Sequence, residues 1–168
     1  MNDLITDILL QKVQKNWKVI AIKFDNINEI LQSIPRTAGI YQIKTTTPIS
    51  VLELHETRND NAHCKFKNKI TESRKLGTLI VQEDLENGYV VYTGHQKFLR
   101  QRCKEHFMGS KGTGCLNLFE IEEFRKYNWW FEYLEVSIFK EYEDSLLFRT
   151  YLEQLHRANI GWPILCSQ

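Results

Sequence analysis

The sequence contains little proline or glycine, with three and eight respectively among its 168 residues. This scarcity excludes a collagen-like repeat and a low-complexity chain. Internal repeats and Ser/Gly-rich linkers are also missing, which favours one continuous domain over residues 1–168. Because 42% of the residues are hydrophobic and 12% are aromatic, the chain can bury a core, and intrinsic disorder is not expected.

Long hydrophobic runs are missing as well. No stretch approaches the ~20 apolar residues that a membrane-spanning helix needs. The apolar N-terminal segment carries Asp3 and Asp7 and no early Lys or Arg, whereas a secretory signal begins with a cationic stretch. These features predict a cytoplasmic protein without a membrane partner.

The cysteines form no C-x-x-C pair and do not have the spacing of zinc ligands. There are four of them: Cys64, Cys103, Cys115 and Cys166. We therefore expect no structural zinc. In a reducing compartment these side chains are expected to act as small buried hydrophobic residues.

A strong net charge is also absent, since the formal charge is +1, but the charge is unevenly distributed. Two segments, 65–75 and 95–111, each carry five Lys or Arg residues against one acid, whereas 120–144 carries eight acids against three bases. A single charged run is most simply a solvated surface. Two basic runs together indicate that a polyanionic partner is worth testing.

Hydrophobic periodicity and capping residues predict helices and strands in alternation. Helices are expected over 3–15, 26–34, 65–75, 97–107 and 145–158. Strands are expected over 17–24, 39–43, 78–82, 89–93 and 128–136, with an extension of the first helix as the alternative for 17–24. The core face of the last helix is expected to consist of Leu147, Phe148, Tyr151, Leu152 and Leu155. This pattern predicts an α+β or α/β fold with a small sheet covered by helices.

Two tripeptides and three polar residues suggest a site. Gly39-Ile40-Tyr41 and Tyr92-Thr93-Gly94 lie on predicted strands. Arg102 and His106 lie one turn apart on one predicted helix, and Glu153 lies on another. Each tripeptide alone is a weak signal, and the strength lies in five matches at compatible spacing.

This order resembles the GIY-YIG nuclease family. The arginine eight residues after the second glycine, the histidine four residues later and the glutamate on a later helix agree with that family, although Thr93 replaces the usual Ile or Val. The resemblance covers roughly 38–166, apart from the segment between the tripeptides. It implies an α+β fold with a small, mostly antiparallel sheet flanked by helices. It also implies an endonuclease that uses Mg²⁺ (or Mn²⁺) to hydrolyse phosphodiester bonds of double-stranded DNA.

The residue types suit that chemistry. Glu153 is the expected metal ligand, because one carboxylate can hold a Mg²⁺ that otherwise keeps its waters. Arg102 offers a permanently charged planar fork to phosphate oxygens. The resemblance implies that Tyr41 or Tyr92 is the general base, and the sequence does not say which. His106 is expected to carry a proton or hold a phosphate.

His95 follows the second tripeptide where many relatives have lysine, and it is expected to support the site in that role. Simpler interpretations stand beside these roles. Tyr41 and Tyr92 could be strand aromatics that pack the core, and Arg102 and His106 could be ordinary surface residues. Glu153 could form exposed helical ion pairs with Arg149 and Arg157, which lie four residues to either side.

The chain departs from the family in two places. Most members join the two motif strands by a short hairpin, whereas Tyr41 and Tyr92 are 51 positions apart, so 44–88 is an insertion. The segment 1–37 precedes the first tripeptide as a helical extension. Near the C-terminus, Cys166 follows Trp162-Pro163-Ile164-Leu165 where the family often has an asparagine after a proline.

An insertion beside the site could supply contacts to base edges. Members with such additions resemble restriction endonucleases, so a sequence-specific type II enzyme is the preferred subtype, and a homodimer on a two-fold site would suit it. The alternatives are a structure-specific or non-specific nuclease and a catalytically silent nucleic-acid-binding module. The expected DNA contacts are Lys65, Lys67, Lys69, Arg74, Lys75, Lys97, Arg100, Lys104 and Lys111.

Overall fold

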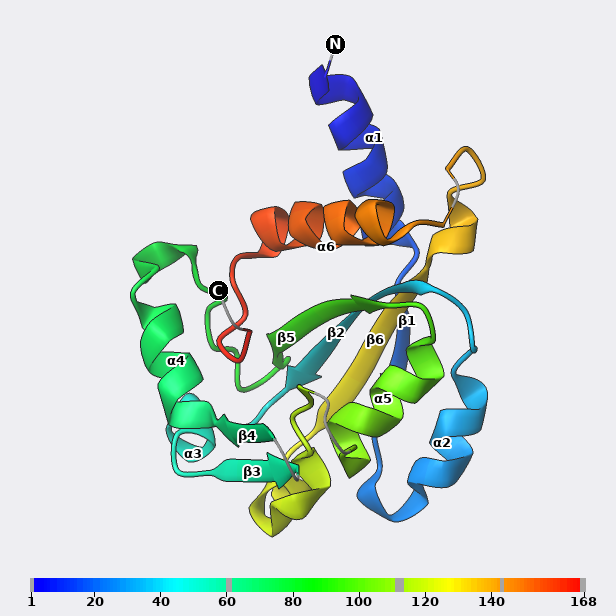
Figure 1. The fold of residues 1–168 in the computed structure, drawn as a ribbon. Helices are drawn as coiled ribbons and strands as arrows, with labels where there is room; N and C mark the ends of the chain where they lie inside the picture. Colours follow the sequence, from blue (N-terminus) through cyan, green and yellow to red (C-terminus); the bar gives the residue numbers. More distant parts are fainter. Residues whose placement is uncertain (1, 60–61, 111–113, 143, 167–168) are drawn as a thin grey trace.

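The computed structural model describes residues 2–59, 62–110, 114–142 and 144–166. A four-stranded antiparallel sheet forms its centre, and helices cover both faces (Figure 1). The strand order is β1 (Lys18–Ala21), β6 (Trp129–Glu135), β2 (Gly39–Thr45) and β5 (Tyr89–Gln96). The predicted α+β class and central antiparallel sheet are therefore confirmed.

The register of the sheet brings the two tripeptides together. Tyr41 lies opposite Gly94 on β5 and opposite Tyr133 on β6, and Ile43 lies opposite Tyr92. Because side chains alternate between faces along a strand, Tyr41 and Tyr92 point to the same face of the sheet. β5 is an edge strand, so residues on either of its faces can meet at the sheet edge.

The helices form one layer on each face of the sheet (Figure 1). On the face that carries Tyr41 lie α5 (Leu99–Met108) and α2 (Ile27–Ser33), and on the other lie α6 (Leu146–Ile160) and α1 (Asn2–Lys15). Outside the insertion, the structure describes the 3-10 helices η1 (Phe24–Asn26), η3 (Leu118–Glu120), η4 (Glu122–Lys126) and η5 (Val136–Ile138).

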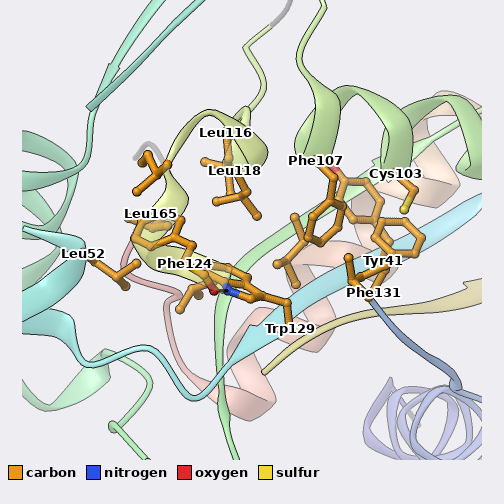
Figure 2. Packing of buried hydrophobic residues seen from close by; sticks show 14 of the residues in the cluster. Tyr41, Leu52, Cys103, Phe107, Leu116, Leu118, Phe124, Trp129, Phe131 and Leu165 are labelled. Atoms are coloured by element: carbon orange, nitrogen blue, oxygen red, sulfur yellow. Dashed lines mark hydrogen bonds between the residues drawn. The ribbon is translucent and has the colours of Figure 1, made fainter. Parts of the chain in front are cut away.

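Each face of the sheet has its own hydrophobic cluster. On the α5 face, Tyr41 packs beside Phe131, with a ring-centroid distance of 5.3 Å, close to Cys103 (Figure 2). On the α6 face, Ile40 and Leu134 pack with Leu152 and with apolar side chains of α1. The two clusters hold α5 and α6 against opposite faces of the same strands.

The core face predicted for the last helix is partly wrong. Ser145 caps α6, accepting a hydrogen bond from the Phe148 N–H at 3.0 Å, and Leu152 is fully buried. However, Leu147 and Tyr151 are 80% and 44% exposed. The reason is that α6 turns a polar stripe toward the sheet; its buried polar members are Arg149, Glu153 and His156.

The N-terminal helix forms as predicted, but only its second half is buried. Leu9 and Val13 join the cluster on the α6 face, whereas Leu4, Ile5 and Ile8 are exposed. The first turns of α1 extend beyond α6 (Figure 1). The strand predicted over 17–24 is shorter and covers only the residues of β1.

The insertion folds as a unit beside the sheet. It contains α3 (Ile49–Leu52), β3 (Glu56–Asn59), β4 (Ala62–Lys65), α4 (Phe66–Arg74) and η2 (Gly77–Leu79). β3 and β4 pair with each other in a separate two-stranded sheet. The helix predicted over 65–75 is confirmed as α4, and Ser73 on it donates a hydrogen bond to the Ile164 carbonyl at 3.1 Å.

The strand predicted over 78–82 is wrong. Leu79 belongs to the 3-10 turn η2, and Ile80 makes only an isolated parallel bridge to Trp162. The segment pairs briefly with the C-terminal end of the chain: the Trp162 N–H donates to the Leu79 carbonyl and the Val81 N–H donates to the Trp162 carbonyl. A short apolar run has no periodicity that would distinguish this local pairing from a true strand.

All four cysteines are buried and none forms a disulfide, as expected for small hydrophobic side chains. Within the described residues, none of the helices combines the length and the apolar character that crossing a membrane requires.

Candidate active site

A cavity of about 300 Å³ lies at the edge of the sheet along β5. Its lining combines residues of β2, β5, α5 and α6. Five of the six residues singled out for the site line it: Tyr41, Tyr92, His95, Arg102 and Glu153. The arginine and the glutamate approach from opposite faces of the sheet and share this cavity. The sixth residue, His106, is fully buried behind Tyr41 and is bonded to its hydroxyl.

Gly94 is the reason that Tyr41 reaches the edge of the sheet from an inner strand. A Cβ at position 94 would lie 2.3 Å from the Tyr41 hydroxyl oxygen and 2.5 Å from Cζ. The phenol ring of Tyr41 therefore passes directly over Gly94, where any side chain would block it. The glycine of the second tripeptide is a steric requirement of this arrangement.

Gly39 has a similar role for α5. A Cβ there would lie 2.2 Å from the Leu134 carbonyl oxygen and 2.8 Å from the Leu99 Cδ1 atom. The absence of a side chain lets the first turn of α5 pack closely on the sheet. This close packing brings Arg102 and His106 of the same helix to Tyr41.

On the α5 face, the Tyr41 hydroxyl accepts two hydrogen bonds. Arg102 donates from Nε at 3.0 Å, and His106 Nε2 lies at 2.9 Å. The Leu116 N–H donates to His106 Nδ1 at 3.3 Å, so a neutral ring carries its proton on Nε2 and donates it to Tyr41. Both bonds are donated to the phenol oxygen, so neither uses the phenolic proton.

Arg102 is held firmly on this side of the cavity. Its Nη1 donates to Glu105 at 2.9 Å and its Nη2 donates to the Gly114 carbonyl at 3.0 Å. A guanidinium has five N–H donors, and these bonds together with the Tyr41 bond use three of them. Arg102 also makes a side-chain hydrogen bond with Tyr92, and its charge lines the cavity, where it can attract an anion.

Burial sets the protonation of this network. It holds the pKa of His106 well below its ordinary value, and the charge of Arg102 acts in the same direction. Burial raises the pKa of Tyr41 well above its ordinary value, the neighbouring Tyr92 adds to this, and Arg102 opposes it. Burial also raises the pKa of Tyr92. His106 and both phenols are therefore neutral near pH 7.

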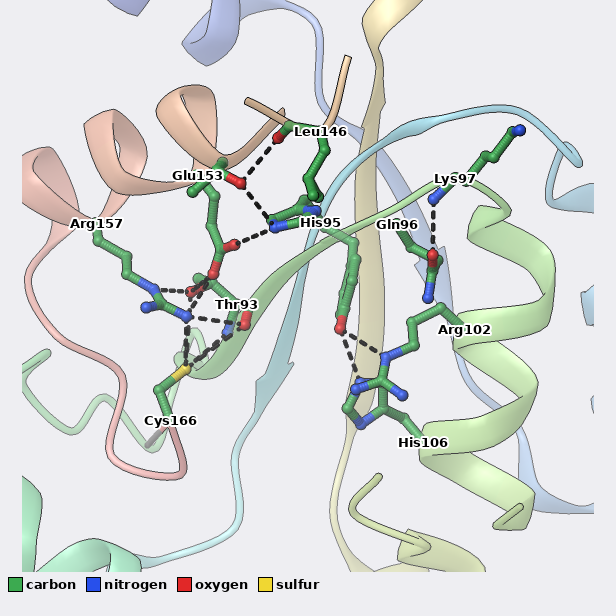
Figure 3. A network of polar contacts seen from close by, with 12 residues as sticks. Thr93, His95, Gln96, Lys97, Arg102, His106, Leu146, Glu153, Arg157 and Cys166 are labelled. Atoms are coloured by element: carbon green, nitrogen blue, oxygen red, sulfur yellow. Dashed lines mark hydrogen bonds and ion pairs between the residues drawn. The ribbon is translucent and has the colours of Figure 1, made fainter. Parts of the chain in front are cut away.

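On the α6 face, Glu153 forms a buried ion pair with Arg157, one helical turn away (Figure 3). Arg157 also donates from Nε to Thr93 Oγ1 at 2.6 Å and from Nη2 to Cys166 Sγ at 3.4 Å. The Thr93 N–H donates to the same sulfur at 3.3 Å. Thr93 and Cys166 thus fix the arginine that holds the carboxylate.

His95 lies beside the second carboxylate oxygen. Its Nε2 is 3.8 Å from Glu153 Oε2 and 3.2 Å from Thr150 Oγ1. The Thr150 hydroxyl donates its proton to the Leu146 carbonyl at 2.8 Å, so in the Thr150 contact the histidine is the donor. The proton of a neutral His95 therefore lies on Nε2, which faces the carboxylate.

The α6 face is more strongly charged than the α5 face. Burial raises the pKa of Glu153, and the charge of Arg157 opposes this effect. Burial lowers the pKa of His95, and the positive charges of Arg149 and Arg157 add to the shift. Arg149 forms its ion pair with Asp144, not with Glu153 as the helical spacing had suggested.

The predicted DNA-contact residues lie outside the cavity and differ in accessibility. Lys65, Lys67, Lys97 and Lys104 are exposed, whereas Lys69 is half-buried. Arg74 and Lys75 are exposed and form ion pairs with Glu53 and Glu72. Arg100 donates hydrogen bonds to the Ile34 and Gln32 carbonyls, so it supports the end of α2. Lys111 lies outside the described residues.

Sequence reasoning missed three groups of this site. Arg157 had been considered only as a surface ion-pair partner, Thr93 only as an atypical motif residue, and Cys166 only as a departure from a family pattern. The spacing of Glu153 and Arg157 could have indicated a pair but not its burial. Nothing in the sequence indicated that the C-terminal segment returns to β5.

A Mg²⁺ ion needs few protein ligands, because it usually keeps several waters and takes one or two carboxylates. Among the described residues, no three His, Cys, Asp or Glu side chains gather into a group that could hold a metal ion. Glu153 is the carboxylate of the cavity. Its Oε2 lies beyond hydrogen-bond distance of His95, so the residues fit a weakly held, hydrated ion better than a multidentate metal site.

The chain was compared with known proteins by sequence and by structure. No family model matches it, and searches of curated proteins and of solved structures returned no match.

Proposed function

We propose that this protein is an endonuclease of the GIY-YIG type that hydrolyses phosphodiester bonds in DNA at the cavity along β5. The observation that carries the proposal is the convergence of Tyr41, Arg102 and Glu153 from three separate elements into one cavity. Tyr92 and His95 line the same cavity. The interpretation of these residues as unrelated core and surface groups does not account for this convergence.

The phosphate would lie against Arg102. The guanidinium is permanently charged, is anchored by Glu105 and Gly114 and lines the cavity. Stabilising charge that develops in a transition state depends on donors that are already in place. The anchoring of Arg102 supplies such a fixed donor.

Glu153 is the proposed ligand for Mg²⁺ or Mn²⁺, which when bound would neutralise phosphate charge and activate water. In the free protein, Arg157 occupies Oε1, and Oε2 is the oxygen that a cation can reach first. Arg157 is then the positioning residue that orients the carboxylate. Cys166 and Thr93 hold that arginine in place.

Tyr41 is the better candidate for the general base. Its oxygen already accepts donors from Arg102 and His106, so a phenolate formed there would have two hydrogen bonds in place. Its raised pKa keeps the phenol neutral in the free protein. Arg102 and His106 are both donors to this oxygen, so the phenolic proton would pass to solvent water in the cavity, and the positive charge of a cation held by Glu153 would favour that loss. Tyr92 and His95 orient the water and the phosphate.

The DNA backbone would extend from the cavity over exposed cations on both sides. Lys65 lies in β4 and Lys67 in α4. Lys97 lies just before α5, and Lys104 lies within it. Sequence specificity, and with it a type II restriction activity, would come from the insertion, because phosphate contacts alone carry no sequence information. One cavity cuts one strand at a time, so we include a homodimer in the proposal, to be tested by sedimentation velocity.

A digest tests the nuclease assignment. Purified protein is incubated with plasmid and phage DNA in Mg²⁺, in Mn²⁺ or in chelator, and the products are separated on a gel. We expect metal-dependent cleavage, with discrete bands for a restriction enzyme and a smear for a non-specific nuclease. Cleavage confined to branched substrates indicates a structure-specific enzyme, and a gel shift without cleavage indicates a silent binding module.

Glu153→Gln provides the residue-level test, with Glu122→Gln as the matched control. Glu122 is an exposed carboxylate on η4 that does not line the cavity. Glu153→Gln should lower cleavage by at least ~10²–10³-fold, the usual effect of removing one group that stabilises a transition state, and leave DNA binding within a few-fold. Cleavage at the wild-type rate by Glu153→Gln would overturn the metal-ligand assignment.

A further inference from the structure

A second and larger cavity, of about 710 Å³, lies next to the catalytic one. It is a groove between the 76–82 segment of the insertion and the C-terminal end of α6. Leu79, Ile80 and Gln82 line one wall. Gln154, Asn159 and Trp162 line the other. Its volume lies within the range of ordinary small-molecule sites.

The two cavities are adjacent, because Gln154 and Arg157 line both of them. Arg157 forms the partition. Its nitrogens hold Glu153 and Thr93 on the catalytic side, and its guanidinium lies over the Trp162 ring at 4.7 Å on the groove side. A molecule seated on Trp162 would therefore lie one side chain away from the proposed catalytic carboxylate.

Backbone hydrogen bonds join the two walls, so the groove exists in the free protein. The Trp162 N–H donates to the Leu79 carbonyl at 2.7 Å, and the Val81 N–H donates to the Trp162 carbonyl at 2.9 Å. Gly161 has a φ of +96°, and a Cβ there would lie 3.0 Å from the Leu79 carbonyl oxygen. Glycine at this position allows these two segments of the chain to approach so closely.

The groove combines an apolar surface with neutral amides. Leu79 is 67% exposed beside Ile80 and Trp162. Gln82, Gln154 and Asn159 are exposed and offer donors and acceptors together. Among the described lining residues none is acidic, and Arg157 is the charged one. This composition suits a flat, neutral heteroaromatic ring with several hydrogen-bonding edges, whereas a phosphate would require more cations.

Trp162 adds an unmet hydrogen-bond donor. Its indole Nε1 is buried, and no partner for it is found within the described residues. An unsatisfied buried donor in a folded protein calls for an explanation, and an unseen water or ligand is a common one. Because this nitrogen is enclosed, a ring nitrogen or carbonyl oxygen of a ligand would bond to it only after the indole shifts toward the groove.

We propose that this groove is a nucleobase-binding subsite for the nucleotide that flanks the scissile phosphate. Adenine is the preferred base, since Asn and Gln amides pair with its N6 and N7 edge. The assignment rests on the proposed nuclease function. In addition, the 76–82 segment and the end of α6 would recognise a base. Part of the sequence preference would then be determined next to the active site.

Binding is tested first without catalysis. In ¹H–¹⁵N NMR spectra of the full chain without metal, the Trp162 indole signal is assigned with Trp162→Phe. The chain is then titrated with dAMP, dGMP, dCMP, dTMP and base-free 2-deoxyribose 5-phosphate. We expect dAMP to shift this signal most and the base-free sugar phosphate not to shift it. Equal shifts with the sugar phosphate, or none with any nucleotide, would overturn the subsite.

Variants then link binding to cleavage. Asn159→Ala and Gln82→Ala should each weaken dAMP binding about tenfold or more, whereas Asn68→Ala, an exposed amide on α4, should not. On DNA randomised at the nucleotides next to the cut, the first two variants should flatten the base preference at one position. An unchanged preference with undiminished cleavage contradicts the subsite alone, whereas base binding without any cleavage by the wild type contradicts only the nuclease.

Discussion

The two halves of the candidate site lie on opposite faces of β5 and are built differently. On the α5 face, Tyr41 is held by neutral or fixed donors inside a hydrophobic cluster, and His106 behind it has no exposed surface. On the α6 face, Glu153 is held by the opposite charge of Arg157. The first half is part of the core, whereas the second is a charge pair that lines the cavity.

This difference separates the hydrogen bonds that folding completes from the carboxylate that would bind a ligand. The hydrogen bonds of Tyr41 are completed by folding, because Leu116 fixes the tautomer of His106 and Glu105 anchors Arg102. The carboxylate of Glu153 already has a cationic partner on Oε1, and an incoming cation would bind at Oε2 beside it. Damage to the α5 half should therefore affect both stability and activity, whereas damage to the α6 half should affect mainly activity.

The largest effect is expected from Gly94→Ala, which breaks the α5 half directly. The new Cβ would overlap the Tyr41 phenol, so the ring must move. We expect a loss of about 1–3 kcal/mol in the free energy of unfolding, as for other overpacked sites, and at least a ~10²-fold loss of cleavage from misplacement of the phenol. Thermal unfolding and a plasmid-nicking assay measure the two effects.

Gly114→Ala is the control for this substitution, because a Cβ there would meet no atom within 4 Å. Its carbonyl, which accepts from Arg102, is retained. It should leave stability and cleavage almost unchanged. A Gly94→Ala variant that cuts as fast as Gly114→Ala would show that the position of Tyr41 does not matter.

A pair of histidine substitutions compares the halves with each other. His106→Gln removes an acceptor from the Leu116 N–H and disturbs the Tyr41 hydroxyl, so we expect a cost of about 1–3 kcal/mol in stability and a large loss of cleavage. His95 is half-buried at the cavity rim. His95→Gln should stay within about 0.5 kcal/mol of the wild-type stability and lose roughly tenfold in cleavage.

Urea unfolding monitored by tryptophan fluorescence gives the stabilities, and initial nicking rates give the activities. If His95→Gln were more destabilising than His106→Gln, it would be wrong that the α5 half contributes to stability and the α6 half mainly to activity.

The α5 half was largely predictable from the sequence, and the reason is geometric. Tyr41 and Tyr92 lie on strands with clear β-forming runs, and Arg102 and His106 share one helix at a spacing of one turn. Local periodicity therefore placed each residue on the correct element. What it could not indicate is that His106 is fully buried and acts through Tyr41 rather than facing the cavity.

The α6 half was less predictable because it depends on distant contacts. Cys166 reaches Thr93 across 73 positions of the chain, and no local pattern indicates this return. The buried stripe of α6 is polar, so hydrophobic patterning assigned Leu147 and Tyr151 to the core incorrectly. A buried polar stripe of this kind depends on partners that are distant in sequence, such as Gln42 for His156, and is invisible to periodicity.

The stability of the α6 face should depend on pH through His156, a buried histidine of α6. Its Nε2 bonds to Gln42 at 2.6 Å, and burial, helped by the charge of Arg157, lowers its pKa from 6.5 to about 4. The folded-state pKa lies below the unfolded value, so the contribution to stability is complete above about pH 6.5 and is lost as the pH falls toward 4. Between pH 7 and pH 5, protonation of this residue in the unfolded chain should lower the free energy of unfolding by on the order of 2 kcal/mol.

Urea unfolding of the wild type and of His156→Gln at pH 7 and pH 5 measures this contribution. The variant should lose less stability over that interval than the wild type does. His106 on the other face is also buried with a lowered pKa, so part of the acid sensitivity should persist in the variant. An identical pH dependence in the two proteins would mean that His156 titrates normally.

The smallest expected effect concerns the cations that flank the two halves. Lys104 is exposed on α5, and Lys67 is exposed on α4, which bonds through Ser73 to the C-terminal segment beside the α6 half. If DNA contacts both flanks, Lys67→Gln and Lys104→Gln should each weaken binding a few-fold and lower the slope of log K against log salt by about 1. Fluorescence anisotropy from low to moderate salt measures both.

Because neither lysine touches the cavity, the cleavage rate at saturating DNA should not change. A slope that falls for only one variant would place the DNA backbone on that flank alone, and the proposed path across both halves would have to be abandoned.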